Sequence, residues 1–229
     1  MTDTVPLIVD LDGTLIDADT LRLSLRILAR SRPWLVPTIP IMVLRGRARF
    51  KEFVSRHVSL DPARLPYRAD VVDFVKRERA TGRRVLLATA ANRKVAEAVA
   101  AHLRLFDDVI ASDGGHNAKG DGKVESIRGV LGDSEFDYVG DSLPDVPVFK
   151  AARKSYLVCP SPDLAQAVRG RCHVEAVFAT ARRTHAQVAV DRLPIRVWTA
   201  PCSPVILPTG SSSDLHPITL DDDFHAPVS

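Results

Sequence analysis

Two aspartates separated by one residue stand close to the start of the chain, in the segment DLDGT. Asp10 and Asp12 follow a short apolar run, and Gly13 comes directly after them. Carboxylates at this spacing can face the same loop, where a glycine lets the backbone turn and approach an anion. A surface turn rich in Asp and Gly has the same composition. A calcium-binding loop does not fit, because its glycine and glutamate positions would be Leu15 and Leu21.

Further residues able to bind a metal ion or a phosphate group occur later, each beside an expected strand or helix. Thr89 ends the run VLLAT, Lys119 and Lys123 lie in NAKGDGK, and Asp141 and Asp145 lie in VGDSLPD. A cluster of carboxylates without cations is electrostatically costly. The set therefore predicts a metal site with a lysine beside it.

Strands and helices alternate along the part of the chain that must position these groups. Short apolar runs predict strands over residues 5–11, 84–88, 108–111, 136–140 and 155–158. Helical spacing separates them, as after Asn92, a residue that can cap a helix. Alternation of this kind predicts an α/β fold, with a parallel sheet covered by helices on both faces. Ligands of such sheets bind beyond the carboxyl ends of the strands, where the acids stand.

The stretch between the first two expected strands has helical spacing and no strand pattern. Helical spacing occurs over residues 21–30, and further helices are expected near 45–58 and 69–80. We therefore expect an all-helical cap over residues 18–79, inserted into a core formed by 1–17 and 80–173. Prolines and the clusters SSSD and DDD follow, so residues 174–229 are expected to form a poorly ordered tail.

The overall composition argues against several classes of protein. Lys and Arg number 31 and Asp and Glu 28, and this net charge of +3 does not suggest a nucleic-acid binder. Three cysteines without a CxxC pair fit a reducing compartment, and the start has no secretory signal, so we expect a cytoplasmic location. Residues 34–44 form the longest apolar stretch, which two prolines break and which is too short to span a bilayer.

Positive charge is concentrated in the expected cap. Residues 20–58 contain nine Lys or Arg residues and one acid, Glu52, a net charge of +8. Apolar residues, among them Trp34, Ile41 and Met42, lie between the arginines. This pattern could dock on the anionic inner face of a membrane or bind an acidic lipid-linked substrate. A solvated arginine-rich face over an ordinary helical core is the alternative, and the sequence leaves both open.

Four motifs in order carry a resemblance to a known family: DxDGT, a strand-terminal Thr, a Lys before a helix, and GDxxxD. The chain resembles the haloacid dehalogenase superfamily of aspartate-nucleophile phosphohydrolases over roughly residues 5–170. The resemblance implies a Rossmann-like core with a helical cap inserted after the first strand. It favours a phosphoryl substrate, because the dehalogenases of the family lack the second aspartate, which is Asp12 here.

The resemblance also implies roles for individual residues. Asp10 would be the nucleophile that forms an aspartyl phosphate, and Asp12 the general acid and then the general base. Lys123 is preferred over Lys119 as the charge-neutralising lysine, because it opens a helix pattern. Asp145 would act through water, hold the lysine, or simply complement a helix N-terminus. The expected catalytic residues are Asp10, Asp12, Thr89 and Lys123; the substrate-binding residues Gly13, Thr14, Thr89 and Ala90; and the Mg²⁺ ligands Asp10, Asp12 (through its carbonyl), Asp141 and Asp145.

A closer likeness concerns segments such as LRGRARFKEFVSRHV and SDGGHNAKGDGK. These are similar to the phosphatase-like domain that precedes UbiA-type prenyltransferase domains in bacterial fusion proteins. The likeness implies a UbiA-type prenyltransferase as a partner and a small phosphorylated substrate, prenyl-linked or a sugar phosphate. Two alternatives stay open. One is a phosphoserine-phosphatase-like enzyme for a small soluble metabolite, and the other is a non-catalytic module that recruits a membrane or a prenyltransferase.

Overall fold

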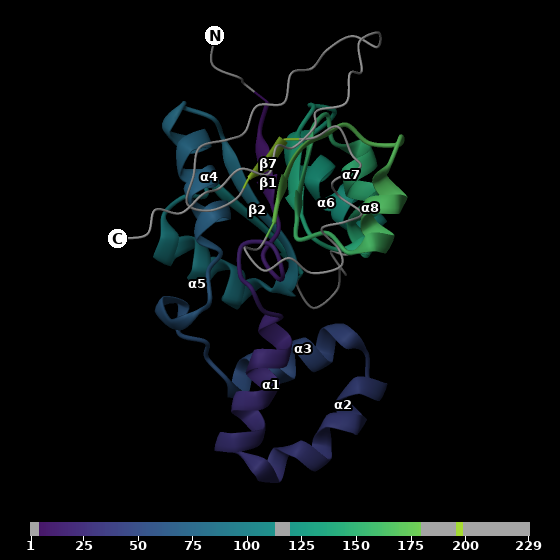
Figure 1. The fold of residues 1–229 in the computed structure, drawn as a ribbon. Helices are drawn as coiled ribbons and strands as arrows, with labels where there is room; N and C mark the ends of the chain where they lie inside the picture. Colours follow the sequence, from purple (N-terminus) through teal and green to yellow (C-terminus); the bar gives the residue numbers. More distant parts are fainter. Residues whose placement is uncertain (1–4, 113–119, 180–195, 199–229) are drawn as a thin grey trace, which may run out of the picture.

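The computed structural model describes residues 5–112, 120–179 and 196–198. At its centre lies a parallel sheet with the strand order β3-β2-β1-β4-β5-β6-β7 (Figure 1). The strands are β1 (Leu7–Val9), β2 (Val85–Asn92), β3 (Asp108–Ser112), β4 (Asp137–Gly140), β5 (Ser155–Val158), β6 (Val174–Phe178) and β7 (Arg196–Trp198). The first five match the apolar runs of the sequence, so the predicted α/β fold with a parallel sheet is confirmed.

Helices cover both faces of this sheet, and the alternation of side chains along β1 shows how. Leu7 and Val9 belong to one hydrophobic core together with side chains of α4 (Ala69–Ala80) and α5 (Arg93–Leu103). Ile8 belongs to the other core, which includes side chains of α6 (Asp121–Leu131), α7 (Val146–Ala151) and α8 (Pro162–Val168). A strand with apolar residues on both faces is what a doubly covered parallel sheet requires.

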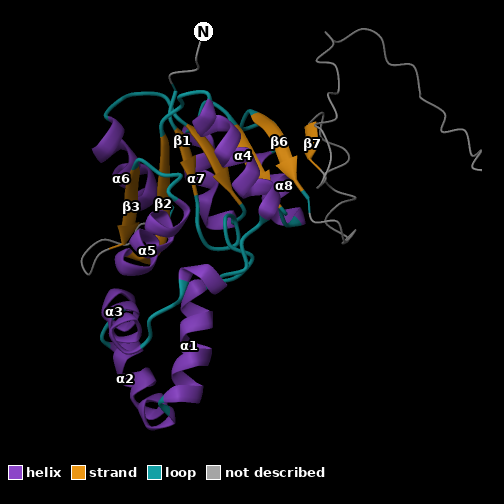
Figure 2. Cartoon of the chain, turned by 90° about the vertical axis from the view of Figure 1, so that its left-hand side faces the viewer, coloured by secondary structure: helices purple, strands orange, loops and turns teal. Residues whose placement is uncertain are grey.

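The helical insertion follows β1 and stands apart from the sheet (Figure 2). It consists of α1 (Thr20–Ser31), the 3₁₀ helix η1 (Pro33–Thr38), α2 (Ile39–Leu44) and α3 (Arg47–His57). Asp19 caps α1 by accepting a hydrogen bond from the Arg22 amide at 2.9 Å. We use the word cap below for residues 20–57. A further 3₁₀ turn, η2 (Pro62–Arg64), lies on the return to the core.

Two of the expected boundaries differ from the structure. Helix α4, except for Ala80, falls within the range 18–79 assigned to the cap, yet Val71 and Val75 are fully buried in the core that covers the sheet. Strand β6 falls within the range 174–229 assigned to the tail, yet it pairs with β5 and buries Ala176, Val177 and Phe178. In both cases an apolar face needed a partner, and the sheet supplied it. Apart from β7, the rest of the expected tail lies outside the described residues.

No helix in the described ranges combines the length and the hydrophobicity needed to cross a bilayer.

Candidate active site

The pairing of the central strands brings the predicted site residues to one edge of the sheet. Val9 pairs with Val139 of β4 on one side and with Leu87 of β2 on the other. Asp10 follows β1 directly, and its amide donates to the Val139 carbonyl at 3.0 Å. Because neighbouring parallel strands end together, the segments that follow β1 and β4 meet at this edge. It is the carboxyl edge, where α/β sheets bind ligands.

Three carboxylates converge at this edge. Ligand oxygens of Asp10, Asp141 and Asp145 all lie within 4.8 Å of one another. Asp145 comes from the 3₁₀ helix η3 (Leu143–Asp145), which follows β4. The three residues lie 131 and 4 positions apart in sequence, so the topology of the sheet brings them together. Asp12 is not part of this triad through its side chain.

A buried lysine supplies positive charge to the triad. Lys123, in the first turn of α6, places its Nζ 2.8 Å from Asp10 Oδ1 and 3.4 Å from Asp145 Oδ1. It also donates to the hydroxyl oxygen of Tyr138 at 2.7 Å, and that hydroxyl donates to Asp145 Oδ2 at 2.9 Å. Ser142 Oγ donates to the same oxygen at 3.0 Å. Lys123 therefore lies beside Asp10, whereas the alternative lysine, Lys119, lies outside the described residues.

The charge balance of the cluster shifts the protonation of its members. Burial raises the pKa of Asp10 to about 8, although Lys123 opposes the shift. Burial also raises the pKa of Asp141, to about 6. Burial lowers the pKa of Lys123, but the facing Asp10 and Asp145 carboxylates outweigh it and the net pKa is raised. One ammonium thus faces three carboxylates, and the cluster is short of positive charge.

These residues fit a hard divalent cation. The carboxylate oxygens are close enough to share one ion, and they are the ligand type that Mg²⁺ selects. Burial, and to a smaller extent the neighbouring carboxylates, raises the pKa of Asp10 and Asp141, and a cation between them would favour their charged forms. Asp10 and Asp141, which the resemblance implied as direct ligands, lie here with Asp145, for which it implied a role through water or through the lysine.

The loop after Asp10 is held against Asp141 by contacts of two kinds. Gly13 has φ +78°, and a Cβ atom at this position would collide with the Asp141 carboxylate. Thr14 is fully buried and its hydroxyl donates to Asp141 Oδ1 at 3.0 Å. The resemblance implied that Thr14 contacts the substrate. In the structure its hydroxyl is hydrogen-bonded to Asp141, a candidate metal ligand. Arg68 donates to the Gly13 carbonyl at 3.0 Å.

Asp12 connects the core to the cap. Its Oδ1 accepts a hydrogen bond from the Thr20 amide, at the start of α1, at 2.8 Å. Burial raises the pKa of Asp12, and the hydrogen bond from Thr20 works in the opposite direction. A carboxyl group with a raised pKa retains a proton at higher pH, as a general acid must.

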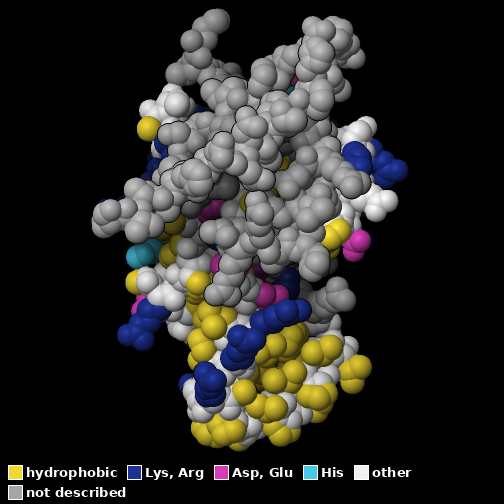
Figure 3. Space-filling view, in the orientation of Figure 1, with side chains coloured by type: hydrophobic (Ala, Val, Ile, Leu, Met, Phe, Trp, Pro, Cys, Tyr) yellow, Lys and Arg dark blue, Asp and Glu magenta, His cyan; other side chains and the backbone are white. Residues whose placement is uncertain are grey.

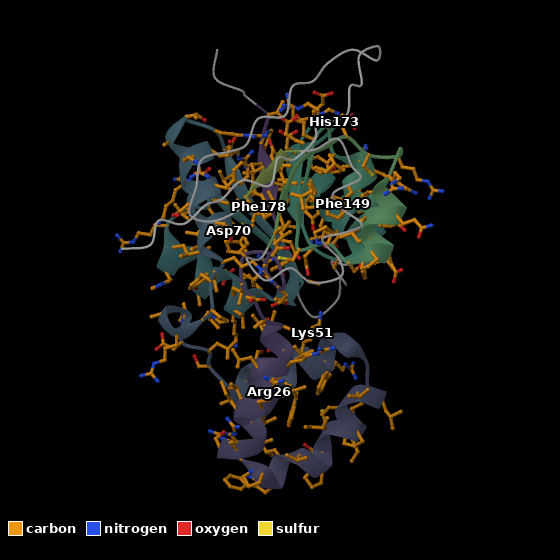
Figure 4. All side chains as sticks on the ribbon, viewed as in Figure 1. Arg26, Lys51, Asp70, Phe149, His173 and Phe178 are labelled. Atoms are coloured by element: carbon orange, nitrogen blue, oxygen red, sulfur yellow. The ribbon has the colours of Figure 1, made fainter. Side chains whose placement is uncertain are left out.

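A cavity of about 860 Å³ lies between the core and the cap. Asp10, Asp12, Gly13, Thr89 and Ala90, all predicted site residues, line it on the core side. The cap contributes apolar and basic side chains: Leu21, Arg22, Val43, Phe50, Lys51 and Val54. Lys51, labelled in Figure 4, reaches the core, where its Nζ donates to the Ala90 carbonyl at 2.6 Å.

Sequence reasoning missed several residues of this site. Tyr138 lies in an apolar strand run, where a tyrosine is typical of a core position. Ser142 lies inside the GDxxxD motif, so its place beside Asp145 could have been noticed. Arg68 and Lys51 lie 55 and 39 residues from the groups that they contact, and no local pattern marks them.

Residues 7–150 match the protein family described as haloacid dehalogenase-like hydrolase. The uncharacterized protein y4nM of Sinorhizobium fredii (strain NBRC 101917 / NGR234) is 37% identical over 155 residues, which are 67% of this chain and 30% of that protein. This chain thus spans less than a third of the length of that curated relative. The expected association with a UbiA-type prenyltransferase stays a prediction.

Two solved structures have a similar fold. A protein of unknown function from Bordetella pertussis Tohama I has a TM-score of 0.61 at 23% identity, covering 76% of this chain and 98% of that one. A phosphoserine phosphatase in its apo form has a TM-score of 0.51 at 19% identity, covering 75% of this chain and 92% of that one. At these identities the likeness establishes the fold alone.

Proposed function

Because this chain belongs to the haloacid dehalogenase-like hydrolase family, we propose that it hydrolyses phosphomonoesters with Asp10 as the nucleophile. The observation that carries this proposal is the position of Asp10. Its carboxylate borders the cavity and accepts a hydrogen bond from Lys123 Nζ at 2.8 Å. It also lies among the three carboxylates that fit one divalent ion.

In the first step, a carboxylate oxygen of Asp10 attacks phosphorus as the bond from phosphorus to the ester oxygen breaks. Asp12 gives its proton to the departing oxygen, so that an alcohol leaves and Asp10 becomes an aspartyl phosphate. Asp12 then takes a proton from a water molecule that attacks phosphorus. Asp10 leaves as a carboxylate, and inorganic phosphate is released.

Other residues of the site would stabilise charge during both steps. Mg²⁺ held by Asp10, Asp141 and Asp145, with the carbonyl of Asp12, would supply positive charge at the phosphoryl oxygens. Lys123 stabilises the Asp10 carboxylate and holds it in one orientation. Thr89 stands at the cavity wall, ready to donate its hydroxyl to a phosphoryl oxygen. The Thr89 Oγ1 already accepts from the Ala91 amide at 3.0 Å, which fixes its direction.

The lining of the cavity favours a phosphomonoester with an apolar group. Leu21, Val43, Phe50 and Val54 line the cavity on the cap side, together with the polar residues Thr20, Ser24 and Ser55. A prenyl-linked phosphate would place its chain against these side chains and its phosphate at Asp10. A sugar phosphate or phosphoserine would leave them in contact with polar groups, which costs free energy.

Phosphate release from an aryl phosphate, measured with and without Mg²⁺, tests the proposed reaction. The wild type is expected to be Mg²⁺-dependent, and D10N to be inactive. Asp133, a fully exposed acid, provides the matched control, and D133N should keep the wild-type rate. A rapidly quenched reaction should yield a phosphorylated protein by intact mass in the wild type only. Equal rates for wild type and D10N would refute the nucleophile assignment.

A comparison of kcat/KM for a short-chain prenyl phosphate, a sugar phosphate and phosphoserine tests the substrate class. We expect the prenyl phosphate to be preferred, and expect V54S to reduce that preference. A preference for phosphoserine would assign the chain to the soluble-metabolite alternative.

A further inference from the structure

The cap carries most of the exposed apolar side chains of the described protein. Eight large hydrophobic side chains are exposed in the described ranges, and six of them lie between positions 27 and 44. They are Ile27, Trp34, Val36, Ile41, Val43 and Leu44. Figure 3 shows hydrophobic side chains covering one face of the cap, with a row of Lys and Arg side chains beside them. Apolar exposure that is concentrated in this way marks an interaction surface.

The centre of this surface is residues 33–44, here called the apolar segment. It contains no charged residue, and neither of its helices, η1 and α2, has a buried residue. Trp34 is 69% exposed and Leu44 is 88% exposed. The turn between α1 and α2 lies at the end of the cap that is farthest from the sheet, as Figures 1 and 2 both show. An apolar segment at such a tip can enter a surface without moving the core.

Arginines stand on both sides of the apolar segment. Arg30 and Arg32 precede it, and Arg45, Arg47 and Arg49 follow it. Arg26 lies on α1 in the same part of the cap (Figure 4). Within the described residues, no ion pair uses the side chains of Arg26, Arg30, Arg32, Arg45 or Arg49. Their charge is therefore available to an external anion.

We propose that this face of the cap docks on an anionic lipid bilayer, with the apolar segment inserted at the interface. Short apolar helices bearing a tryptophan bind at the boundary between head groups and acyl chains, and flanking arginines pair with anionic head groups. The apolar stems of the arginines can extend along the same surface. A plane of negative charge suits arginines that lie on both sides of an uncharged segment, in a cap whose only acid is Glu52. Glu52 itself is paired with Arg56 at 3.0 Å.

Sedimentation of the full chain with vesicles tests this proposal. The probes are vesicles of phosphatidylcholine alone and of phosphatidylcholine with phosphatidylglycerol, each at low and high salt. W34S/L44S removes apolar anchors, and R30S/R32S/R45S removes charge. V130S is the matched apolar control, because Val130 is exposed on the core. R104S/R128S/R169S removes the same charge from exposed positions of the core.

We expect the wild type and both core controls to sediment with the anionic vesicles only, and salt to reduce that binding. Both cap variants should lose at least tenfold in the bound-to-free ratio. Absence of binding, or equal binding by wild type and W34S/L44S, would overturn the proposal. A dimer in light scattering that W34S/L44S dissociates would also overturn it, because it would assign the surface to a second copy. D10N should bind as the wild type does, which separates this result from the proposed catalysis.

Discussion

Strand β4 begins with Asp137 and is followed by Asp141. The two carboxylates differ in how far nearby cations neutralise them. Asp137 is fully buried and accepts hydrogen bonds from Arg83 and from Arg153, whose Nε lies at 2.9 Å and Nη2 at 2.8 Å. The Lys154 amide donates to it as well, at 3.1 Å. Asp141, at the other end, stands with Asp10 and Asp145 around a single lysine.

This difference separates a structural end of the sheet from a functional one. Two guanidinium groups hold one carboxylate at Asp137, so that end is complete without a ligand. At Asp141 the carboxylates outnumber the cations, and burial raises its pKa to about 6. A buried acid that its surroundings leave underneutralised marks a functional site, whereas a fully paired buried acid contributes to the fold.

The largest effect is expected at the structural end. D137N removes the buried charge that Arg83 and Arg153 share and leaves Arg83 with Glu78 alone, at 2.7 Å. Loss of one partner of a buried ion pair typically costs roughly 3–5 kcal/mol of the free energy of unfolding. Urea unfolding at pH 7 measures it, with D133N as the exposed control. The fraction that remains folded should keep the wild-type kcat. If D137N reduced kcat at unchanged stability, the comparison between the two ends would fail.

At the functional end, D141N should reduce activity and leave stability unchanged or higher. It removes a metal-ligand candidate and one negative charge, so Mg²⁺-dependent kcat/KM should fall at least about a hundredfold, the upper range for loss of groups that merely support ligands. Stability without Mg²⁺ should stay at or above the wild-type value, because repulsion among the carboxylates decreases. Calorimetry and phosphate release on the same preparation give both numbers. Destabilisation as large as that of D137N would show that Asp141 is a structural acid too.

The dependence of stability on pH provides a third test. Asp10 and Asp141 have pKa values of about 8 and about 6 in the folded protein, above their ordinary value of 3.8. The folded state therefore binds more protons than the unfolded state, and the stability that this supplies below about pH 4 is lost as the pH rises toward 8. D141N should reduce that loss. Melting temperatures measured without metal from pH 4 to 8 would reveal the difference between the two proteins.

Mg²⁺ should restore the stability that the wild type loses as the pH rises. At about 100 times its Kd, a ligand that binds only the folded state adds about 2.7 kcal/mol. The gain should grow from pH 5 to pH 8, because protons compete with the ion for the same carboxylates. D137N should respond to Mg²⁺ as the wild type does, whereas D141N should not. A gain that does not change with pH would locate the ion elsewhere.

The residues that meet at the functional end were named from the sequence, through local motifs and the resemblance that these motifs carry. Asp10 and Asp141 follow apolar strand runs and Thr89 ends one, and parallel strands bring their carboxyl ends to one edge. Lys123 was predictable because it opens a helix pattern. The structural end was not predicted at all. Arg83 and Arg153 reach Asp137 across 54 and 16 residues, and arginines near strand starts are too common to indicate a buried cluster.

The errors in the expected boundaries have a related cause. Spacing predicted that α4 is a helix with one apolar face, but spacing does not identify the surface that this face meets. Strand β6 contains Glu175 within an otherwise apolar run and stands next to a change in composition. Burial of Ala176, Val177 and Phe178 beside β5 is a tertiary property. Pairing with β5 therefore determines that this segment forms a buried strand, which its local propensity does not predict.

The smallest effect is expected at Tyr138, which lies in an expected strand and whose hydroxyl contacts the active-site cluster. Its hydroxyl lies 2.7 Å from Lys123 Nζ and 2.9 Å from Asp145 Oδ2. Y138F removes both contacts, but the hydrogen bonds from Lys123 to Asp10 and from Ser142 to Asp145 remain. The expected loss is about 1 kcal/mol in the free energy of unfolding, with a fall of less than tenfold in kcat. Y156F, on the adjacent strand and in the other hydrophobic core, is the matched control for stability and should leave kcat unchanged.

Because the hydroxyl of Tyr138 connects the lysine to the acid, Y138F should also alter the pH dependence of kcat. A pH profile identical to that of the wild type would make Tyr138 a packing residue only, and the functional end would then consist of Lys123 and the aspartates without it.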